Sequence, residues 1–180
     1  MRNIVAGLFV SLDGVVESPE KWQMPYFNDE MGAEIGAQLA QADALLLGRR
    51  TYEEFADFWP QQGDAGPGAF MNNVPKLVVS RTLDTVEWHN SSLIKGDVVD
   101  QLSELKQQPG KNILVDGSSV LTRTLATNDL VDEYSLHVYP IVLGSGKRLF
   151  PEGKRLDLTL VEASPLPTGV VFMRYRRQSS

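Results

Sequence analysis

Three short aliphatic runs, at 45–47, 77–79 and 113–115, each end in a group of glycine, arginine or hydroxyl residues. Glycine lets the backbone approach a ligand closely, hydroxyl and helix N–H groups donate to phosphate oxygens, and arginine supplies a bidentate cation. Ligands of open α/β sheets bind outside the carboxyl ends of parallel strands. Three such ends therefore favour a phosphate-bearing ligand over three unrelated helix caps. The residues concerned are Gly48, Arg49 and Thr51 after the first run, Ser80 and Arg81 after the second, and Gly117, Ser118 and Ser119 after the third.

Other motifs that could carry chemistry are incomplete. The run 144–147 (Gly-Ser-Gly-Lys) is similar to part of a P-loop, but Arg148 stands where Ser or Thr would bind magnesium. The two histidines, His89 and His137, have no carboxylate at metal-ligand spacing, so no metal site is predicted. The chain has no cysteine, which excludes disulfides and thiol catalysis. A chain poor in acid–base groups and rich in phosphate-binding ends suits a reaction whose chemistry a cofactor brings.

Length and composition narrow the class of protein. With 180 residues, 42% of them hydrophobic and 22% charged, residues 1–180 are expected to form a single domain. The net charge of −6 makes nucleic acid a poor partner and leaves a small-molecule substrate as the expected one. No run approaches the roughly 20 apolar residues of a membrane span, so no membrane partner is expected. The absence of cysteine is consistent with a cytoplasmic location.

Hydrophobic patterning predicts the elements that position the strand ends. Helices are expected after Asn28, over about 51–58, from Val98 to the stop at Pro109-Gly110, and for two turns after Ser119, while 60–75 is expected to be a surface loop. Strands are expected at 4–12, 44–47, 76–79, 86–89, 112–115, 132–143, 156–160 and 171–175. Strand and helix alternate in the first two-thirds, and only strands follow. This order predicts an α/β fold with a parallel core and antiparallel C-terminal strands in one mixed sheet.

Four motifs, in this order and spacing, resemble those of a known family. They are Ser11-Leu12-Asp13-Gly14, Gly48-Arg49-Arg50-Thr51-Tyr52-Glu53, Val115-Asp116-Gly117, and the segment from Asp132 to Gly146. Over 4–176 the chain resembles the dihydrofolate-reductase-like superfamily, and most closely the C-terminal reductase domain of the bifunctional riboflavin-biosynthesis deaminase–reductase. The resemblance implies a mixed sheet of about eight strands flanked by about four helices.

The resemblance also implies NADPH as cofactor and assigns the site residues. Gly48, Arg49 and Thr51 would contact its phosphates, Ser80 and Arg81 the adenosine 2′-phosphate, and Gly117, Ser118 and Ser119 the pyrophosphate. The loop 143–147, with Leu143, Gly144 and Gly146, would lie near the nicotinamide. Asp13 would face the nicotinamide and the substrate as the catalytic residue; the alternative is a turn-forming residue before Gly14.

The chain departs from the family pattern at two places. Dihydrofolate reductases carry a carboxylate on the first long helix, where this chain has Gly32, with Asp29 and Glu30 on other faces of the helix. The paired glycines usual at the cofactor turn are here Asp116-Gly117. The deaminase half of the bifunctional enzyme is absent from this chain.

The expected function is therefore that of an NADPH-dependent oxidoreductase similar to 5-amino-6-(5-phosphoribosylamino)uracil reductase, acting on a small heterocyclic or ribosyl substrate. The alternatives are a dihydrofolate or pterin reductase and a non-catalytic dimeric nucleotide-binding module. Relatives of this type are often dimers, so a homodimer is the assembly that the resemblance implies.

Overall fold

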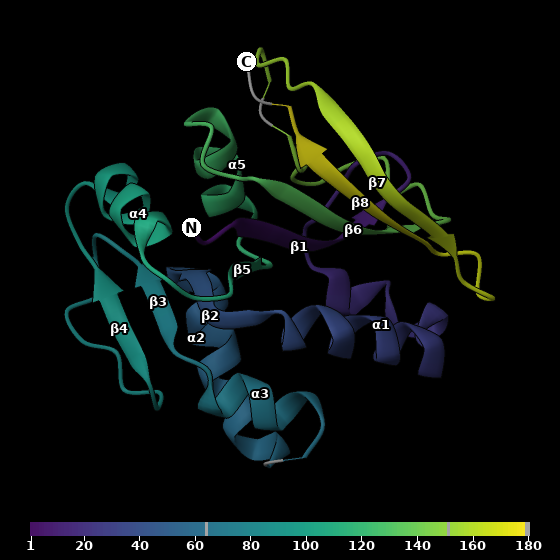
Figure 1. The fold of residues 1–180 in the computed structure, drawn as a ribbon. Helices are drawn as coiled ribbons and strands as arrows, with labels where there is room; N and C mark the ends of the chain where they lie inside the picture. The colour runs from purple at the N-terminus through teal and green to yellow at the C-terminus, as the bar shows by residue number, and fades with distance from the viewer. Residues whose placement is uncertain (64, 151, 179–180) are drawn as a thin grey trace.

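A computed structural model describes residues 1–63, 65–150 and 152–178 (Figure 1). Its elements follow the alternation that the sequence predicts. The strands are β1 (Ile4–Ser11), β2 (Ala42–Gly48), β3 (Lys76–Val79), β4 (Ser91–Ile94), β5 (Asn112–Asp116), β6 (Glu133–Tyr139), β7 (Leu158–Pro165) and β8 (Val171–Arg177). The helices are α1 (Asp29–Ala40), α2 (Arg49–Phe58), α3 (Pro67–Asn73), α4 (Val98–Gln107) and α5 (Ser119–Thr127), with short 3₁₀ helices at 19–21, 24–26 and 59–62. Asn28 caps α1, as expected, because its side chain accepts a hydrogen bond from the Met31 N–H.

The eight strands form one mixed sheet in the order β4-β3-β2-β5-β1-β6-β8-β7. The first six are parallel, and β8 pairs antiparallel with both β6 and β7. This arrangement confirms the predicted fold class. Helices cover both faces of the parallel part: α1, α2 and α3 lie below the sheet in Figure 1, and α4 and α5 lie above it.

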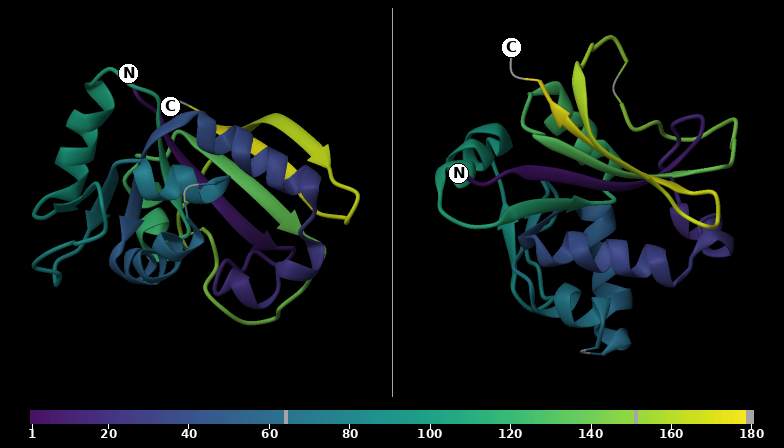
Figure 2. Two further views of the ribbon diagram at one scale, coloured as in Figure 1. Left: turned by 90° about the horizontal axis from the view of Figure 1, so that it is seen from below. Right: turned by 45° about the vertical axis from the view of Figure 1, so that its right-hand side comes forward.

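Side-chain alternation along the strands divides the core between the two faces. Ile113 and Val115 of β5 pack with Leu102 of α4 and Leu125 of α5. Leu114 faces the other way, into the cluster that includes residues of α1, α2 and α3. The views in Figure 2 show α1 running along the sheet beside β1 and β6. No helix of the described residues is long and apolar enough to cross a bilayer.

Two expectations about the elements were wrong. The segment 60–75, expected to be a loop, contains α3, and five α-helices replace the four expected; Asp64 lies outside the described residues. Pro67 begins α3 at a position that needs no N–H donor, and Met71 buries itself in the core. The segment 86–89, expected to be a strand, is irregular, because the Tyr52 hydroxyl accepts hydrogen bonds from the Glu87 and Trp88 N–H groups. Strand β4 begins at Ser91, two residues after this segment.

The strand registers create a step at the carboxyl edge of the sheet. Strand β5 ends at Asp116, which lies beside Gly7 of β1. Strands β1 and β6 continue together for four more residues, to Ser11 and Tyr139. Beyond Gly7, β1 therefore projects past β5, and we call this place the step. The Ile4 carbonyl points toward β6, where it accepts a hydrogen bond from the Asp132 N–H. Backbone groups of successive residues in a strand point to alternate sides, so the N–H and C=O of Phe9 point away from β6 and into the step.

Candidate cofactor and substrate site

The ends of β2 and β5 are joined by two hydrogen bonds at the carboxyl edge. The Gly48 N–H donates to the Ser118 Oγ over 2.9 Å, and the Ser118 N–H donates to the Thr51 Oγ1 over 3.1 Å. The end of β2 and the end of β5 thus hold each other in place. Four of the residues predicted to bind phosphate, with Gly117 included, are thereby brought together.

The first turn of α5 presents N–H donors that have no partner within the helix. Gly117 and Ser118 have φ angles of 59° and 50°, and the Ser118 side chain does not cap its own helix. The N–H groups at the start of a helix have no partner within the helix, and a helix N-terminus favours an anion. Ser119 is the first residue of α5. This geometry suits the turn to an anion such as a phosphate group.

Gly117→Ala is expected to destabilise the protein. The left-handed backbone costs a residue with a Cβ about 1–2 kcal/mol, and that Cβ would lie 3.2 Å from the Thr51 Cγ2. For a chain of this length, a loss of that size lowers the melting temperature by roughly 2–8 °C. Gly36→Ala on α1 is the matched control, because its Cβ meets nothing within 4 Å and alanine favours a helix. Equal melting temperatures for the two variants would contradict this description of the turn.

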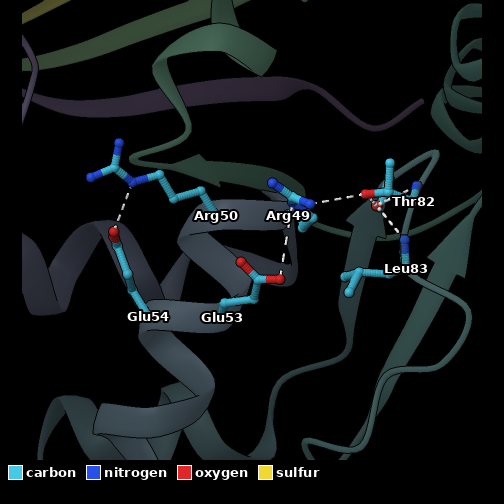
Figure 3. A network of polar contacts seen from close by, with 7 residues as sticks. Arg49, Arg50, Glu53, Glu54, Thr82 and Leu83 are labelled. Atoms are coloured by element: carbon cyan, nitrogen blue, oxygen red, sulfur yellow. Dashed lines mark hydrogen bonds and ion pairs between the residues drawn. The ribbon is translucent and has the colours of Figure 1, made fainter.

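Arg49 connects the end of β2 to the end of β3. Its Nη1 donates to the Thr82 Oγ1 over 3.2 Å, and the Ser80 Oγ accepts the N–H groups of Thr82 and Leu83 (Figure 3). Ser80 is buried and shapes the turn, whereas Arg81 is exposed. The hydroxyl of Thr82, which the sequence did not single out, lies between the two strand ends. The third predicted strand end thus joins the other two.

The ion pairs of Arg49 and Arg50 at this edge are weak. Arg49 lies 4.0 Å from Glu53 and Arg50 lies 3.0 Å from Glu54, with both guanidinium groups more than half exposed. In Figure 3, Arg50 extends toward Glu54, whereas the Arg49 guanidinium lies between Glu53 and Thr82. Exposed pairs of this kind contribute about 0–1 kcal/mol. Either arginine is therefore free to turn to a phosphate.

On the other side of the step, Asp13 joins the turn after β1 to the start of the loop 143–147. Its carboxylate accepts hydrogen bonds from the Ser11 Oγ at 2.7 Å, from the Leu143 N–H at 3.1 Å and from the Gly144 N–H at 2.8 Å. These bonds lower the pKa of Asp13 to about 2. Its carboxylate stays charged at neutral pH and fixes the start of the loop 143–147.

Asp13→Asn is expected to lower the melting temperature in a pH-dependent way. The amide keeps one acceptor oxygen and turns an NH₂ group toward a backbone N–H. The folded-state pKa of Asp13 lies below its ordinary 3.8, so its stabilisation is complete above that value and is lost as the pH falls toward 2. Melting curves of both proteins between pH 2 and 7 should therefore converge in acid. A constant difference across this range would contradict the role of the charge.

The rest of the loop 143–147 packs on the turn after β1. The Val16 N–H donates to the Lys147 carbonyl, and the Lys147 N–H donates to the Glu17 Oε2 over 3.3 Å. Gly146 has a φ of 126°, and a Cβ there would lie 2.5 Å from the Val15 Cγ1. Only glycine allows this approach. Leu143 and Gly144 thus lie beside Asp13, and Gly146 lies beside Val15 and Glu17.

Asp116 occupies the inner end of the step. The residue is partly exposed, yet desolvation raises the pKa of its carboxyl to about 6. A hydrogen bond from the Gly117 backbone acts in the opposite direction and lowers this pKa. Leu114 belongs to the cluster between the sheet and α1 and α2. Because side chains alternate along a strand, Asp116 lies on the same face of the sheet as Leu114. The sequence marked this residue only as a departure from a glycine pair. Its position makes it a carboxyl group that exchanges protons near neutral pH.

Aromatic side chains fill the α1 face beyond Asp116. Tyr139 packs edge-to-face against Phe9, Trp22 and Tyr26, at centroid distances of 5.9, 5.1 and 5.6 Å. This cluster anchors the segment 17–28 over the ends of β1 and β6. At the start of α1, a Cβ on Gly32 would lie 3.6 Å from the Phe27 ring, and both Asp29 and Glu30 are exposed.

Comparison with known proteins identifies the family. Residues 2–172 match the family described as the RibD C-terminal domain. The chain belongs to this family. It is 30% identical to the uncharacterized protein YyaP of Bacillus subtilis (strain 168), over 97% of this chain and 94% of that protein.

Solved structures share the fold of this RibD C-terminal domain. A putative riboflavin biosynthesis protein from Shewanella sp. PV-4 superimposes with a TM-score of 0.81 at 24% identity, covering 99% of this chain and 100% of that one. A pyrimidine reductase-like protein from Corynebacterium diphtheriae superimposes with a TM-score of 0.68 at 15% identity, covering 99% and 93%.

The predicted site residues of this RibD C-terminal domain form two groups, one on each side of the step. The strand-end group comprises Gly48, Arg49, Thr51, Ser80, Arg81, Gly117, Ser118 and Ser119, and the turn group comprises Asp13, Leu143, Gly144 and Gly146. Sequence reasoning missed the backbone groups of Phe9 and the carboxyl of Asp116. Only the carboxyl left a signal, as an acidic residue where glycine is usual.

Proposed function

We propose that this RibD C-terminal domain is an NADPH-dependent reductase that transfers hydride to a small heterocyclic or ribosyl substrate. The nearest named activity is that of 5-amino-6-(5-phosphoribosylamino)uracil reductase. Residues 1–180 would work as a single reductase domain, and a homodimer remains the expected assembly.

The observation that carries this proposal is the joining of three phosphate-binding strand ends beside one titratable carboxyl. The Gly48–Ser118–Thr51 bonds and the Arg49–Thr82 bond gather donors and cations on one side of the step. Asp116 lies at its inner end. A phosphate-bearing cofactor laid across the strand ends would therefore bring its far end to this carboxyl.

The residues present fit NADPH. The α5 N-terminus and Thr51 would hold the pyrophosphate, because the left-handed turn at Gly117 leaves the first N–H groups of α5 without partners in the helix. Arg49, Ser80 and Arg81 would hold the 2′-phosphate. The N–H and C=O of Phe9 match the carboxamide of a nicotinamide ring. When bound, the cofactor supplies hydride.

The protein must also place a proton. Hydride adds to the carbon of a C=N or C=O bond in the substrate, and the heteroatom then takes a proton. Asp116 is the group suited to give it, since the pKa of its carboxyl is raised to about 6. The pKa of Asp13 is about 2, so this residue, predicted to face the nicotinamide and the substrate, would do so as an anion that also holds the loop 143–147.

The direct test is the oxidation of NADPH with 5-amino-6-(5-phosphoribosylamino)uracil as acceptor, followed by absorbance. We expect steady turnover that saturates with acceptor. Binding of NADPH without turnover, for this acceptor and for a panel of small heterocyclic and ribosyl compounds, would instead favour the nucleotide-binding module. Absence of NADPH binding would reject both.

A further inference from the structure

On the face of the sheet that α1 covers, the strand registers set a row of polar residues across the strands. Asp116 of β5 lies beside Gly7 of β1, Gly7 beside Ser135 of β6, and Ser135 beside Arg174 of β8. The row ends at Glu162 of β7. Neighbouring strands lie about 4.8 Å apart, so Asp116 and Ser135 flank Gly7 at about that distance on either side. A polar row thus leads from the step to the antiparallel edge of the sheet.

Gly7 leaves a gap in this row, and Gln38 of α1 occupies it. A Cβ on Gly7 would lie 2.8 Å from the Gln38 Nε2. The Nε2 is buried and has no hydrogen-bond partner among the residues that the structure describes. Leaving a buried amide donor unpaired costs about 1–3 kcal/mol. The Gln38 amide therefore needs an acceptor in the space between Asp116 and Ser135.

A narrow cleft reaches the same amide from outside. It runs between α1 and the sheet and admits molecules of the size of water. The Nε of Arg174, also buried, has no hydrogen-bond partner in the described part of the chain. Buried Ser135 and half-buried Gln38 line the cleft together with Glu34, Gln41, Glu133 and Arg174 and with the apolar side chains of Val5, Leu114 and Phe172, so Gln38 and Ser135 are the lining residues nearest in the row to Asp116.

We propose that Gln38 and Ser135 hold water in this cleft and connect Asp116 to solvent beneath α1, so that the carboxyl can regain its proton while cofactor and substrate cover the step. This inference rests on the proposed function, since it presumes that Asp116 gives up a proton in each turnover. Gln38 acts as a positioning residue.

The proton balance of this route is complete. The Asp116 O–H bond breaks as the substrate heteroatom takes the proton. The resulting carboxylate takes a proton from the adjacent water, which takes one in turn from hydronium or a buffer acid of the solvent at the mouth of the cleft. The Ser135 hydroxyl can accept one proton and release another, whereas the Gln38 amide can only orient the water. The charged groups around the cleft are Glu34, Glu133, Glu162, Arg174 and Arg176, and desolvation with the nearby Glu162 raises the pKa of Glu34.

The test compares Gln38→Leu with Gln41→Leu, which changes the same cleft. In wild-type protein without cofactor, the Asp116 carboxyl is titrated by carbon-13 NMR. Removing water from beside Asp116 disfavours its charged form, so Gln38→Leu should move its pKa upward by about half a pH unit or more. With an acceptor present, Gln38→Leu should also lower kcat several-fold and raise its solvent isotope effect. The affinity for NADPH should stay unchanged.

Gln41→Leu should leave both readouts at the wild-type value. Ser135→Ala is the second variant. It should change the Asp116 titration and the turnover in the same direction as Gln38→Leu, and it replaces Gln38→Leu in the test if that variant does not fold. An unchanged Asp116 titration in Gln38→Leu or, failing that, in Ser135→Ala would overturn the inference. The titration needs no turnover, so it can overturn the inference even if the protein reduces no acceptor. A failure to reduce any acceptor would count against the proposed function alone.

Discussion

Asp116→Asn is expected to lower turnover by about a hundredfold or more, with little change in the affinity for NADPH. The variant keeps the shape of the side chain and removes its only transferable proton. With a pKa of about 6, roughly a tenth of the wild-type protein carries this proton at pH 7. Wild-type turnover should therefore fall as the pH rises above 6, and the variant should lack this descending limb.

Asp100→Asn on α4 is the control for this prediction, since Asp100 is exposed and lies on the opposite face of the sheet. Its turnover and pH profile should match those of wild type. Wild-type turnover in Asp116→Asn, or an unchanged descending limb, would show that the proton comes from another group.

Dihydrofolate is expected to be a poor substrate. Reduction of a pterin C=N bond needs a proton on the ring nitrogen, and assistance by a placed acid is worth about 10²–10⁴ in rate. The position on α1 where dihydrofolate reductases carry a carboxylate is Gly32, and a Cβ built there would lie 3.6 Å from the Phe27 ring. Asp29 and Glu30 are exposed. The remaining α1 carboxylate, Glu34, lies toward Glu162 and Arg174 rather than the step.

The assay is NADPH oxidation with dihydrofolate at neutral pH. We expect slow turnover that saturates weakly. A turnover of about 10 s⁻¹, typical of well-adapted enzymes, would contradict this expectation and promote the dihydrofolate reductase alternative.

The strand ends could be predicted from the sequence because their signals are local. Each aliphatic run stops at glycine, arginine or a hydroxyl residue, and parallel strands end at one edge of the sheet. The bonds of Gly48 with Ser118 and of Arg49 with Thr82 follow from that common edge. Asn28 was likewise visible as a cap, since the cap and the helix that it begins are neighbours in the chain.

The step and the polar row depend on contacts between distant segments. Nothing near Asp116 in the sequence shows that β1 continues past it, because only the pairing of Gly7 with Asp116 sets that level. The amide of Gln38 reaches Gly7 across 31 positions of the chain. The helix α3 was missed for a related reason, since the burial of Met71 outweighs the loop-forming composition around it.

Binding of NADPH by the three strand ends is measured by calorimetric titration with NADPH and NADH at the same salt concentration. A charged hydrogen bond contributes about 1.5–3 kcal/mol, so the 2′-phosphate at Arg49, Ser80 and Arg81 should tighten binding at least about tenfold. Arg81→Ala should weaken NADPH binding and leave NADH binding nearly unchanged. Equal dissociation constants for the two cofactors in the wild-type protein would contradict the account.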